Sequence, residues 1–430
     1  MKIVEMRVTP IAIGDPPLLN AAGLHAPYAL RTIVELVTDD GLTGLGEIPG
    51  GSATLALLRQ MAEVVVDHDP WQLNSIKAAL VAKMGDGGTS TLKNVRPWET
   101  PRINHVWSAI EVACFDLMGQ SVDRPVVDLL GGVVRERVPY SAYLFFKYAG
   151  AGGALGFGTD PAASGWAAAR QAEALTPEGI VAQARGMIDA FGFESVKLKA
   201  GILDPDLETD AILALRAALG PDVPLRIDPN GAWTHETALR CGQRMAGALE
   251  YYEDPVRGQD GMARLRAAMP GMPFATNMCT TSYADIPGAV ASGSEDIILT
   301  DHHFWGGLRS TLELNRVAST FGRGLSMHSN SHAGISLAAM THLAAATPML
   351  TYACDTHYPW QSDELIVGGK LAIEDGCVRV SREPGLGIRL DRDALERLHQ
   401  QYLACGLTDR DDEVEMRKVE PDWRFMPVRY

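Results

Sequence analysis

Excess positive charge is missing from this 430-residue chain. It has 38 lysines and arginines against 53 aspartates and glutamates, a formal net charge of −15 at pH 7. Nucleic acids and anionic membranes attract proteins with a surplus of basic side chains, so this balance argues against nonspecific binding to either. An acidic small molecule stays open as a ligand, because the local charge of a site matters more than the total.

Cysteines are few and scattered. The six lie far apart and form no C-x-x-C pair, so the sequence offers neither a zinc site nor a disulfide framework. We expect them to be small core residues in a reducing cytoplasm. They are Cys114, Cys241, Cys279, Cys354, Cys377 and Cys405.

A signal peptide and a membrane span are also missing. Residues 1–16 are interrupted by Glu5, Arg7 and Thr9, so they lack the apolar core of a signal sequence. The stretch 324–354 contains no Asp, Glu, Lys or Arg, but its histidines and its asparagine favour a buried segment of a globular domain over a membrane helix.

Two lysines stand two residues apart in the segment ESVKLKAG, at Lys197 and Lys199. Side chains two apart on a strand point the same way. Adjacent ammonium groups repel, so each should make the other easier to deprotonate, which suits a catalytic base. The alternative is a polar strand edge with two solvated lysines.

After Lys199, apolar strand-like runs end in a polar residue every 24 to 29 positions. These residues are Asp228, Glu253, Asn277, Asp301, His328 and Asp355. The segments between them have apolar residues at helical spacing, as in ETDAILALRAALG. Strands that alternate with helices form a parallel sheet, and this many units predict a (β/α)8-type barrel with its chemistry at the carboxyl ends of the strands.

The remaining chain predicts a second domain. Residues 1–135 contain strand-like runs, a hairpin through Asp40-Gly41 and helices near 53–67 and 105–120, which indicates an α+β capping domain. The barrel then spans 136–369, and residues of about 370–430, with a helix over 391–405, return to complete the cap. A glycine-rich run at 150–158 lacks the third glycine of a dinucleotide fingerprint, and we expect a mobile loop near the barrel mouth.

Asp228, Glu253 and Asn277 end three successive strands, and their oxygen atoms are the hard ligands that Mg²⁺ prefers. The alternative is three separately hydrogen-bonded polar residues. Asp301 and His328 end the next two strands, where a carboxylate would fix the imidazole tautomer and raise its basicity. Together, the two lysines, the metal ligands and the His-Asp pair predict a reaction in which a proton α to a carboxylate is abstracted. The metal would stabilise the enediolate that forms.

The chain resembles the glucarate dehydratase subgroup of the enolase superfamily over nearly its full length. The resemblance is carried by LLN and HAP (18–27), GEIPGG (46–51), YLFF (143–146), KLK (197–199), DPNGAW (228–233), EDP (253–255), ATNM (275–278), HFW (303–305), HSN and ISLA (328–338), DTH (355–357) and RDD (410–412). K-x-K alone is weak, whereas asparagine as the third metal ligand together with HSN and DTH is specific to this subgroup.

The resemblance implies a site and a reaction. Lys199 and the His328-Asp301 pair would be the two bases, with Lys197 beside them, and Asp228, Glu253 and Asn277 would bind Mg²⁺. A six-carbon diacid sugar would be held by His25, Tyr143, Lys197, Asn230, Ser329, Asn330, His357 and Arg410. The implied reaction is dehydration of D-glucarate to 5-keto-4-deoxyglucarate, accompanied by epimerisation to L-idarate, in a cytoplasmic homo-oligomer.

The chain departs from the subgroup's pattern in three places. Arg102-Ile103 replace a threonine pair, KLKAG replaces KLKGG, and HSNSHAGIS replaces HSNNHFDIS. An added cation and a lost hydroxyl at Arg102-Ile103 would change which diacid is accepted. Two alternatives stay open: a racemase, epimerase or dehydratase of another hydroxy-diacid that uses the same residues, and a noncatalytic sugar-acid binding protein.

Overall fold

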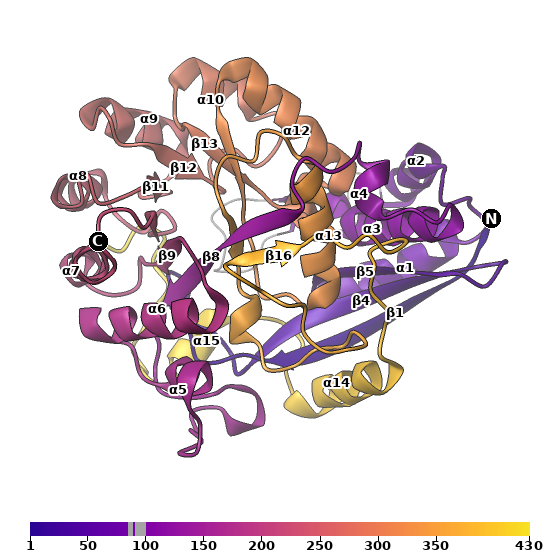
Figure 1. Cartoon of the computed structure of the whole chain (residues 1–430), viewed down its shortest axis with the longest axis horizontal. Helices are drawn as coiled ribbons and strands as arrows, with labels where there is room; N and C mark the ends of the chain where they lie inside the picture. The colour runs from indigo at the N-terminus through magenta and orange to yellow at the C-terminus, as the bar shows by residue number, and fades with distance from the viewer. Residues whose placement is uncertain (85–88, 91–99) are drawn as a thin grey trace.

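The computed structural model describes residues 1–84, 89–90 and 100–430, and of residues 89, 90 and 100–102 only the backbone. The side chain of Arg102, which the sequence singles out for specificity, therefore lies outside the described part. The chain forms a barrel and an N-terminal antiparallel sheet beside it, with the two termini on opposite sides of the molecule (Figure 1).

The N-terminal sheet has the order β1-β4-β5, with β1 (Ile3–Gly14), β4 (Tyr28–Thr38) and β5 (Thr43–Pro49) antiparallel. The expected hairpin joins β4 to β5, with Gly41 at a φ of 84° that favours glycine. Its helices are α1 (Ser52–Val65), α2 (Leu73–Met84), α3 (Arg102–Ser121) and α4 (Val126–Leu129), and its two-residue strands are β2 (Leu19–Asn20), β3 (Gly23–Leu24), β6 (Thr89–Ser90) and β7 (Thr100–Pro101).

Helix α3 and strand β5 pack so closely that the backbone of the helix approaches the backbone of the strand. A Cβ added at Gly44 would lie 2.1 Å from the carbonyl oxygen of Ala113, and one at Gly46 would lie 2.1 Å from that of Ala109. Only glycine fits at such an approach. This close packing fixes the strand that carries Glu47 at the edge of the site.

The barrel consists of eight strands, which are β8 (Arg137–Phe145), β9 (Val196–Lys199), β10 (Leu225–Asp228), β11 (Tyr251–Glu253), β12 (Phe274–Thr276), β13 (Ile297–Thr300), β14 (Gly324–Met327) and β15 (Cys354–Thr356). Neighbours pair in parallel from β8 to β14, and β15 pairs with β8. Between β14 and β15 a bridge from Leu325 to Leu350 closes the ring. The (β/α) barrel and its α+β cap are thus confirmed.

Helices cover the outside of the barrel (Figure 1). They are α5 (Gly165–Gln171), α6 (Pro177–Phe191), α7 (Pro205–Leu219), α8 (His235–Arg244), α9 (Gly258–Ala268), α10 (Ile286–Ser292), α11 (His302–Trp305), α12 (Leu308–Phe321) and α13 (Gly334–Ala346). All residues of α13 are buried, because it packs against the barrel strand β8 on one side and β5 and α4 of the cap on the other. This double burial explains why residues 324–354 carry no charge.

The C-terminal segment divides between the two domains. Strand β16 (Cys377–Arg379) pairs with β8, so it extends the barrel sheet and is no part of the cap. Helix α14 (Arg392–Cys405) packs on β1, where His399 and Gln401 contact the carbonyl oxygens of Pro10 and Ala12. Helix α15 (Asp412–Met416) packs against β3. The predicted return to the cap therefore holds for α14 and α15 only, and the exact domain boundaries stay a prediction.

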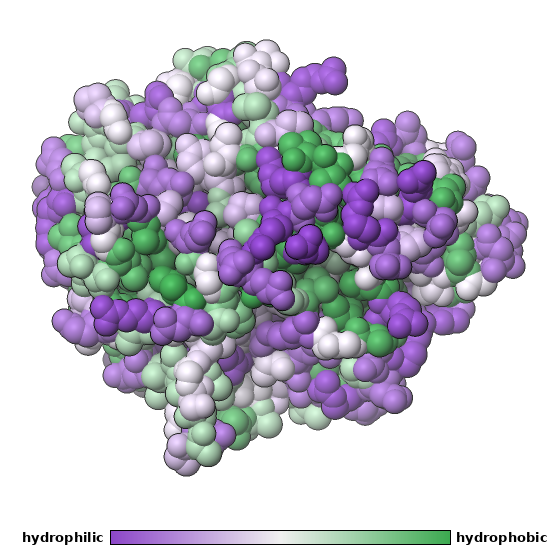
Figure 2. Space-filling view, in the orientation of Figure 1, coloured by the Kyte–Doolittle hydropathy of each residue, from purple (hydrophilic) through white to green (hydrophobic). Residues whose placement is uncertain are grey.

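The surface in Figure 2 mixes hydrophilic and hydrophobic residues over this face. The projection at the bottom of both views is the loop between β8 and α5, which contains the short 3-10 turn η1 (Gly153–Leu155). Its Gly153 donates a backbone hydrogen bond to Pro27 of the cap. The loop therefore lies against the segment that leads into β4, and its mobility stays a prediction.

No helix in the described ranges is long and apolar enough to cross a membrane. All six cysteines lie within these ranges and are free, three of them buried.

Candidate active site

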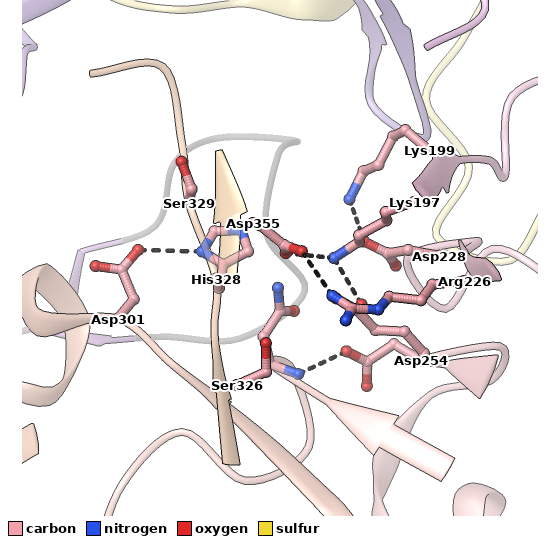
Figure 3. Close-up of polar contacts among 12 residues, drawn as sticks. Lys197, Lys199, Arg226, Asp228, Asp254, Asp301, Ser326, His328, Ser329 and Asp355 are labelled. Carbon is pink, nitrogen blue, oxygen red and sulfur yellow. Dashed lines mark hydrogen bonds and ion pairs between the residues drawn. The ribbon is translucent and has the colours of Figure 1, made fainter. Parts of the chain in front are cut away.

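The polar residues at the strand ends face one another across the mouth of the barrel. Asp228 and Glu253 are the last residues of β10 and β11, and Asn277, Asp301 and His328 directly follow β12, β13 and β14. The carboxyl ends of parallel strands meet at one edge, so this spacing brings them together. In the view of Figure 3, the lysines and Asp228 lie on one side, and His328 and Asp301 lie on the other.

Three carboxylates surround Lys197. Its ammonium nitrogen lies 2.6 Å from Glu253, 2.6 Å from Asp355 and 3.7 Å from Asp228, and all four side chains are fully buried. Lys199 pairs with Asp228 at 2.6 Å. Charges taken out of water need such partners to remain ionised.

These contacts contradict one expectation from the sequence. Burial disfavours the charged form of Lys197, but the carboxylates of Asp355 and Glu253 outweigh it and hold the pKa of this lysine well above its ordinary value. The direction of this pKa shift is thus opposite to the one expected from repulsion between two ammonium groups, and a role of Lys197 in proton transfer stays a prediction. Its nitrogen lies 4.9 Å from the centre of the Tyr143 ring.

Glu253 and Asp228 respond in opposite ways to the same burial. Burial and the neighbouring Asp228 raise the pKa of Glu253 well above its ordinary value. Burial also acts on Asp228, but Lys199 and Lys197 more than compensate and lower its pKa. The Lys197 ammonium, 2.6 Å from Glu253, lowers the pKa of this carboxyl but does not offset burial and Asp228.

The side-chain amide of Asn277 is buried and has no hydrogen-bond partner among the residues that the structure describes. Within the same described ranges, Oε1 of Glu253 is likewise unpaired. The backbone N–H of Asn277 donates to Asp254 at 2.8 Å and holds the residue in place. Buried polar atoms without partners are rare and call for an explanation. An amide oxygen and two carboxylates fit a magnesium ion well.

His328 and Asp301 form the expected pair. Nδ1 of His328 lies 3.1 Å from Oδ2 of Asp301, and the side-chain amide of Asn330 donates to the same oxygen at 3.3 Å. Burial lowers the pKa of His328, and Asp301 only partly offsets this effect. His328 is therefore neutral near pH 7 and suited to accept a proton.

One cavity collects the predicted substrate residues from both domains. It is lined by Leu18, Asn20, His25, Tyr143, Phe145, Lys199, Asn230, Asn277, His328, Ser329, Asn330, Ser331, His357 and Arg410. Lys197 is the one predicted substrate contact that the structure places outside this lining. Asp228, Glu253 and Asp301 lie behind it.

One end of the cavity collects two imidazoles and a guanidinium, each held by a carboxylate. Asp15, which is fully buried, lies 3.2 Å from His25 of the cap and 3.2 Å from His357 of the barrel. The two imidazoles lower the pKa of Asp15 despite its burial. Arg410 is held by Asp412 through two hydrogen bonds of 2.7 and 2.6 Å. These groups suit the second carboxylate of a diacid.

Sequence reasoning missed several residues that support the site. Asp355 was recognised as a strand end but given no role, although it pairs with Lys197. Asp15 and His303 were not singled out, because a lone Asp after a strand and the second His of HHFW carry no spacing signal. The carboxylate in the RDD motif, Asp412, could have been found as the partner of Arg410, two positions away.

Two of the departures from the subgroup pattern lie next to the site. Ser331, in HSNSHAGIS, donates to Asp15 at 3.1 Å and lines the cavity. Ala200, in KLKAG, is fully buried behind Lys199. In the third departure, Arg102-Ile103, the side chain of Ile103 is half-buried and packs against the core.

The chain matches known proteins over both domains. Residues 179–394 match the family described as enolase C-terminal domain-like, and residues 17–131 match the N-terminal domain of mandelate racemase and muconate lactonizing enzyme. A probable glucarate dehydratase of Streptomyces coelicolor is 44% identical over 98% of this chain and 97% of its own length.

Two solved structures are also similar to this chain. An enolase from Thermobispora bispora, complexed with magnesium and formate, is 49% identical with a TM-score of 0.93 and covers 100% of both chains. An enolase from Pseudomonas fluorescens, with bound magnesium, potassium and tartrate, is 47% identical with a TM-score of 0.92 and covers 100% of this chain and 99% of its own.

The protein belongs to the enolase superfamily. Within this superfamily it is a homologue of the Streptomyces protein named a probable glucarate dehydratase.

Proposed function

We propose that this protein removes water from a six-carbon sugar diacid, with D-glucarate as substrate and 5-keto-4-deoxyglucarate as product. The observation that carries the proposal is one cavity with a base on each side, Lys199 and His328, and with hydrogen-bond donors that could hold a second carboxylate, namely His25, His357 and Arg410. The relative named a probable glucarate dehydratase supports this substrate.

Asp228, Glu253 and Asn277 would hold Mg²⁺. When bound, the ion supplies the positive charge that stabilises an enediolate. The magnesium in two closely similar solved structures supports this assignment, as do the unpaired atoms of Glu253 and Asn277.

The chain's own residues would perform the proton transfers. Either Lys199 or His328 would remove the proton α to the substrate carboxylate, according to which face carries it. When His328 is the base, its cavity-side nitrogen gains this proton and would give it to the departing β-hydroxyl group, so the products are one water and an enol that becomes the 2-keto acid. When Lys199 is the base, the elimination would need His328 to enter the reaction with a proton on that nitrogen. Asp301 keeps the imidazole oriented in both steps.

The far end of the cavity would orient the substrate. His25, His357 and Arg410 would bind the distal carboxylate, and Asn230, Ser329 and Asn330 would donate to or accept from the hydroxyl groups, as their amide and hydroxyl groups permit. Tyr143 would contact the substrate above Lys197. Holding both ends fixes the α-carbon between the bases, which lowers the barrier through orientation.

A second function is favoured by the same pair of bases. When one base takes the α-proton and the other returns a proton to the opposite face, the configuration of the α-carbon is inverted. Epimerisation to L-idarate would therefore accompany dehydration. Without the elimination step, the same residues would make the protein an epimerase. Measuring keto product with semicarbazide and inverted substrate by NMR separates the two reactions.

The test is a screen of six-carbon diacids with the Mg²⁺-loaded protein, followed by α-proton exchange in D₂O. Exhaustive EDTA treatment should abolish turnover, and activity that survives it would remove the metal assignment. With two epimeric diacids, Lys199→Ala should lose exchange of one epimer, and His328→Gln should lose exchange of the other. Loss of the same epimer in both variants would exclude opposed bases. No turnover across the whole screen would favour a noncatalytic binding protein.

A cytoplasmic location and a homo-oligomeric state are part of this proposal. The six free cysteines support a reducing compartment. Cell fractionation and light scattering test the two statements.

A further inference from the structure

Asp301 accepts hydrogen bonds from two imidazoles, although the reaction proposed above uses only one of them. Its Oδ2 accepts from His328 at 3.1 Å. Its Oδ1 lies 2.9 Å from Nδ1 of His303 and also accepts from the backbone N–H of His303 at 2.9 Å. His303 is 5% exposed and does not line the substrate cavity. It approaches the carboxylate from the side opposite His328.

A chain of contacts leads from His303 into the capping domain. Nε2 of His303 lies 3.0 Å from the hydroxyl of Ser336 in α13, and that hydroxyl accepts from Nη2 of Arg31 in β4 at 3.2 Å. Arg31 is 1% exposed. Glu47 in β5 fixes both neighbours, because it accepts from Nε of Arg31 at 2.7 Å and from the backbone N–H of Ser336 at 2.8 Å.

The chemistry of the groups gives this chain a single direction. A guanidinium can only donate and a carboxylate can only accept, so the hydroxyl of Ser336 accepts from Arg31, and Nδ1 of His303 donates to Asp301. In the neutral form of the ring, Nε2 of His303 then has only a lone pair. It accepts the hydrogen of the Ser336 hydroxyl. Since Asp301 accepts on both sides, His328 also keeps its hydrogen on Nδ1, and its lone pair lies on the other nitrogen.

A cation site is the competing explanation of this cluster. Potential ligand atoms of Asp301, His302 and His303 lie within 4.8 Å of one another. Both ring nitrogens of His303 are already hydrogen-bonded, however, and Asp301 holds His328 and Asn330 as well. The contacts therefore favour a hydrogen-bond relay.

We propose that Arg31 is a positioning residue for the base His328, acting through Ser336, His303 and Asp301. The cap thus contributes to the proton transfer as well as to substrate binding. The importance of the relay for catalysis rests on the proposed function, whereas the order of its hydrogen bonds does not.

Charged groups from both domains surround the relay. Those that act on its histidines and its carboxylate are Lys197, Asp355, His302, His332, Arg31 and Glu47. Against this background, each N–H that donates to Asp301 withdraws negative charge from it. Removing one makes Asp301 a stronger partner for imidazolium, and His328 becomes more basic.

The first experiment reads the hydrogen-bond order directly by ¹⁵N NMR of the histidine rings in the full-length protein at pH 8. Signals of His303 are assigned by their loss in His303→Asn. We expect a neutral ring protonated on Nδ1. In Ser336→Ala, the Nε2 signal should move downfield, towards that of a nitrogen without a donor, whereas Thr341→Val, which removes a buried hydroxyl from the same helix, should leave it unchanged. A ring protonated on Nε2, or no response to Ser336→Ala, overturns the proposal.

The second experiment measures the pH profile of α-proton exchange for the epimer that His328 deprotonates. His303→Leu should move the acidic limb to higher pH by about half a unit or more, because His328 must be neutral to act. His303→Asn, which keeps an N–H near Asp301, should return the limb towards that of the wild type. Identical limbs in both variants overturn the proposal. If no diacid is exchanged or turned over by the wild type, the proposed function fails, and the NMR result still decides the relay.

Discussion

Replacing Asn277 by leucine should make the metal-free protein more stable and should remove its response to magnesium. Asn277 is 7% exposed, and neither polar atom of its amide is bonded. A buried polar group without a partner costs about 1–3 kcal/mol. Leucine has a similar volume and no polar atom, so Asn277→Leu should raise the free energy of unfolding by about 1–3 kcal/mol in EDTA.

Magnesium should reverse the ranking. At a concentration of 1,000 times its Kd, a ligand that binds only the folded state adds about 4.1 kcal/mol to the free energy of unfolding. The wild type should gain this amount, and Asn277→Leu should gain almost none. Asn277→Asp is the matched control: it keeps an oxygen ligand but adds a carboxylate beside Asp228 and Glu253, so it should be less stable than the wild type in EDTA and should recover with Mg²⁺.

Urea unfolding of EDTA-treated protein, with and without Mg²⁺, measures these differences. The reasoning is refuted if Asn277→Leu is less stable than the wild type without metal, because the unpaired amide would then not be a cost. It is also refuted if the variant gains as much from Mg²⁺ as the wild type, because Asn277 would then not be a ligand.

Three further predictions address the rest of the molecule. Arg410→Ala should lower kcat/KM at least about tenfold, or ~1.4 kcal/mol, whereas the exposed Arg424→Ala should not, and a loss below threefold would exclude Arg410 from substrate binding. Asp15→Asn should raise KM about tenfold with a smaller effect on kcat, since it removes the anion that holds two imidazoles at the far end of the cavity; an unchanged KM would contradict this role. Burial raises the pKa of Glu111 from 4.5 to about 7, so the folded state binds the proton more tightly and the free energy of unfolding falls as pH rises from 4.5 through 7. Thermal unfolding of Glu111→Gln between pH 5 and 8 should therefore show a flatter pH dependence than that of the wild type. Parallel curves would refute this prediction.

The barrel could be predicted because its signal repeats. Each unit has an apolar strand and a helix at constant spacing, and a polar residue marks the end of each strand from Asp228 to Asp355. The pairing of strand β16 could not be predicted, for the opposite reason. Three residues around a turn, Cys377–Arg379, look the same whether they pair with the cap or with β8. Only tertiary contacts decide between these partners.

The two lysines show where local reasoning fails for the site. Their spacing correctly predicts that both point the same way, but their charge state depends on residues from three other strands. Asp355 lies 158 positions from Lys197, and no pattern in the sequence announces the contact. Asp15 is a similar case, because its partners His25 and His357 come from different domains.

The charge balance of the barrel centre explains how a protein with a net charge of −15 can accept a dianion. Three buried cations meet three buried carboxylates there, namely Lys197, Lys199 and Arg226 with Asp228, Glu253 and Asp355. Arg226 also pairs with Glu250 at 2.6 Å, so the centre has no excess of positive charge of its own. A divalent cation held there would add positive charge, which the carboxylates of the proposed substrate would neutralise. Each should therefore favour the binding of the other, since separate charges in a buried site are costly.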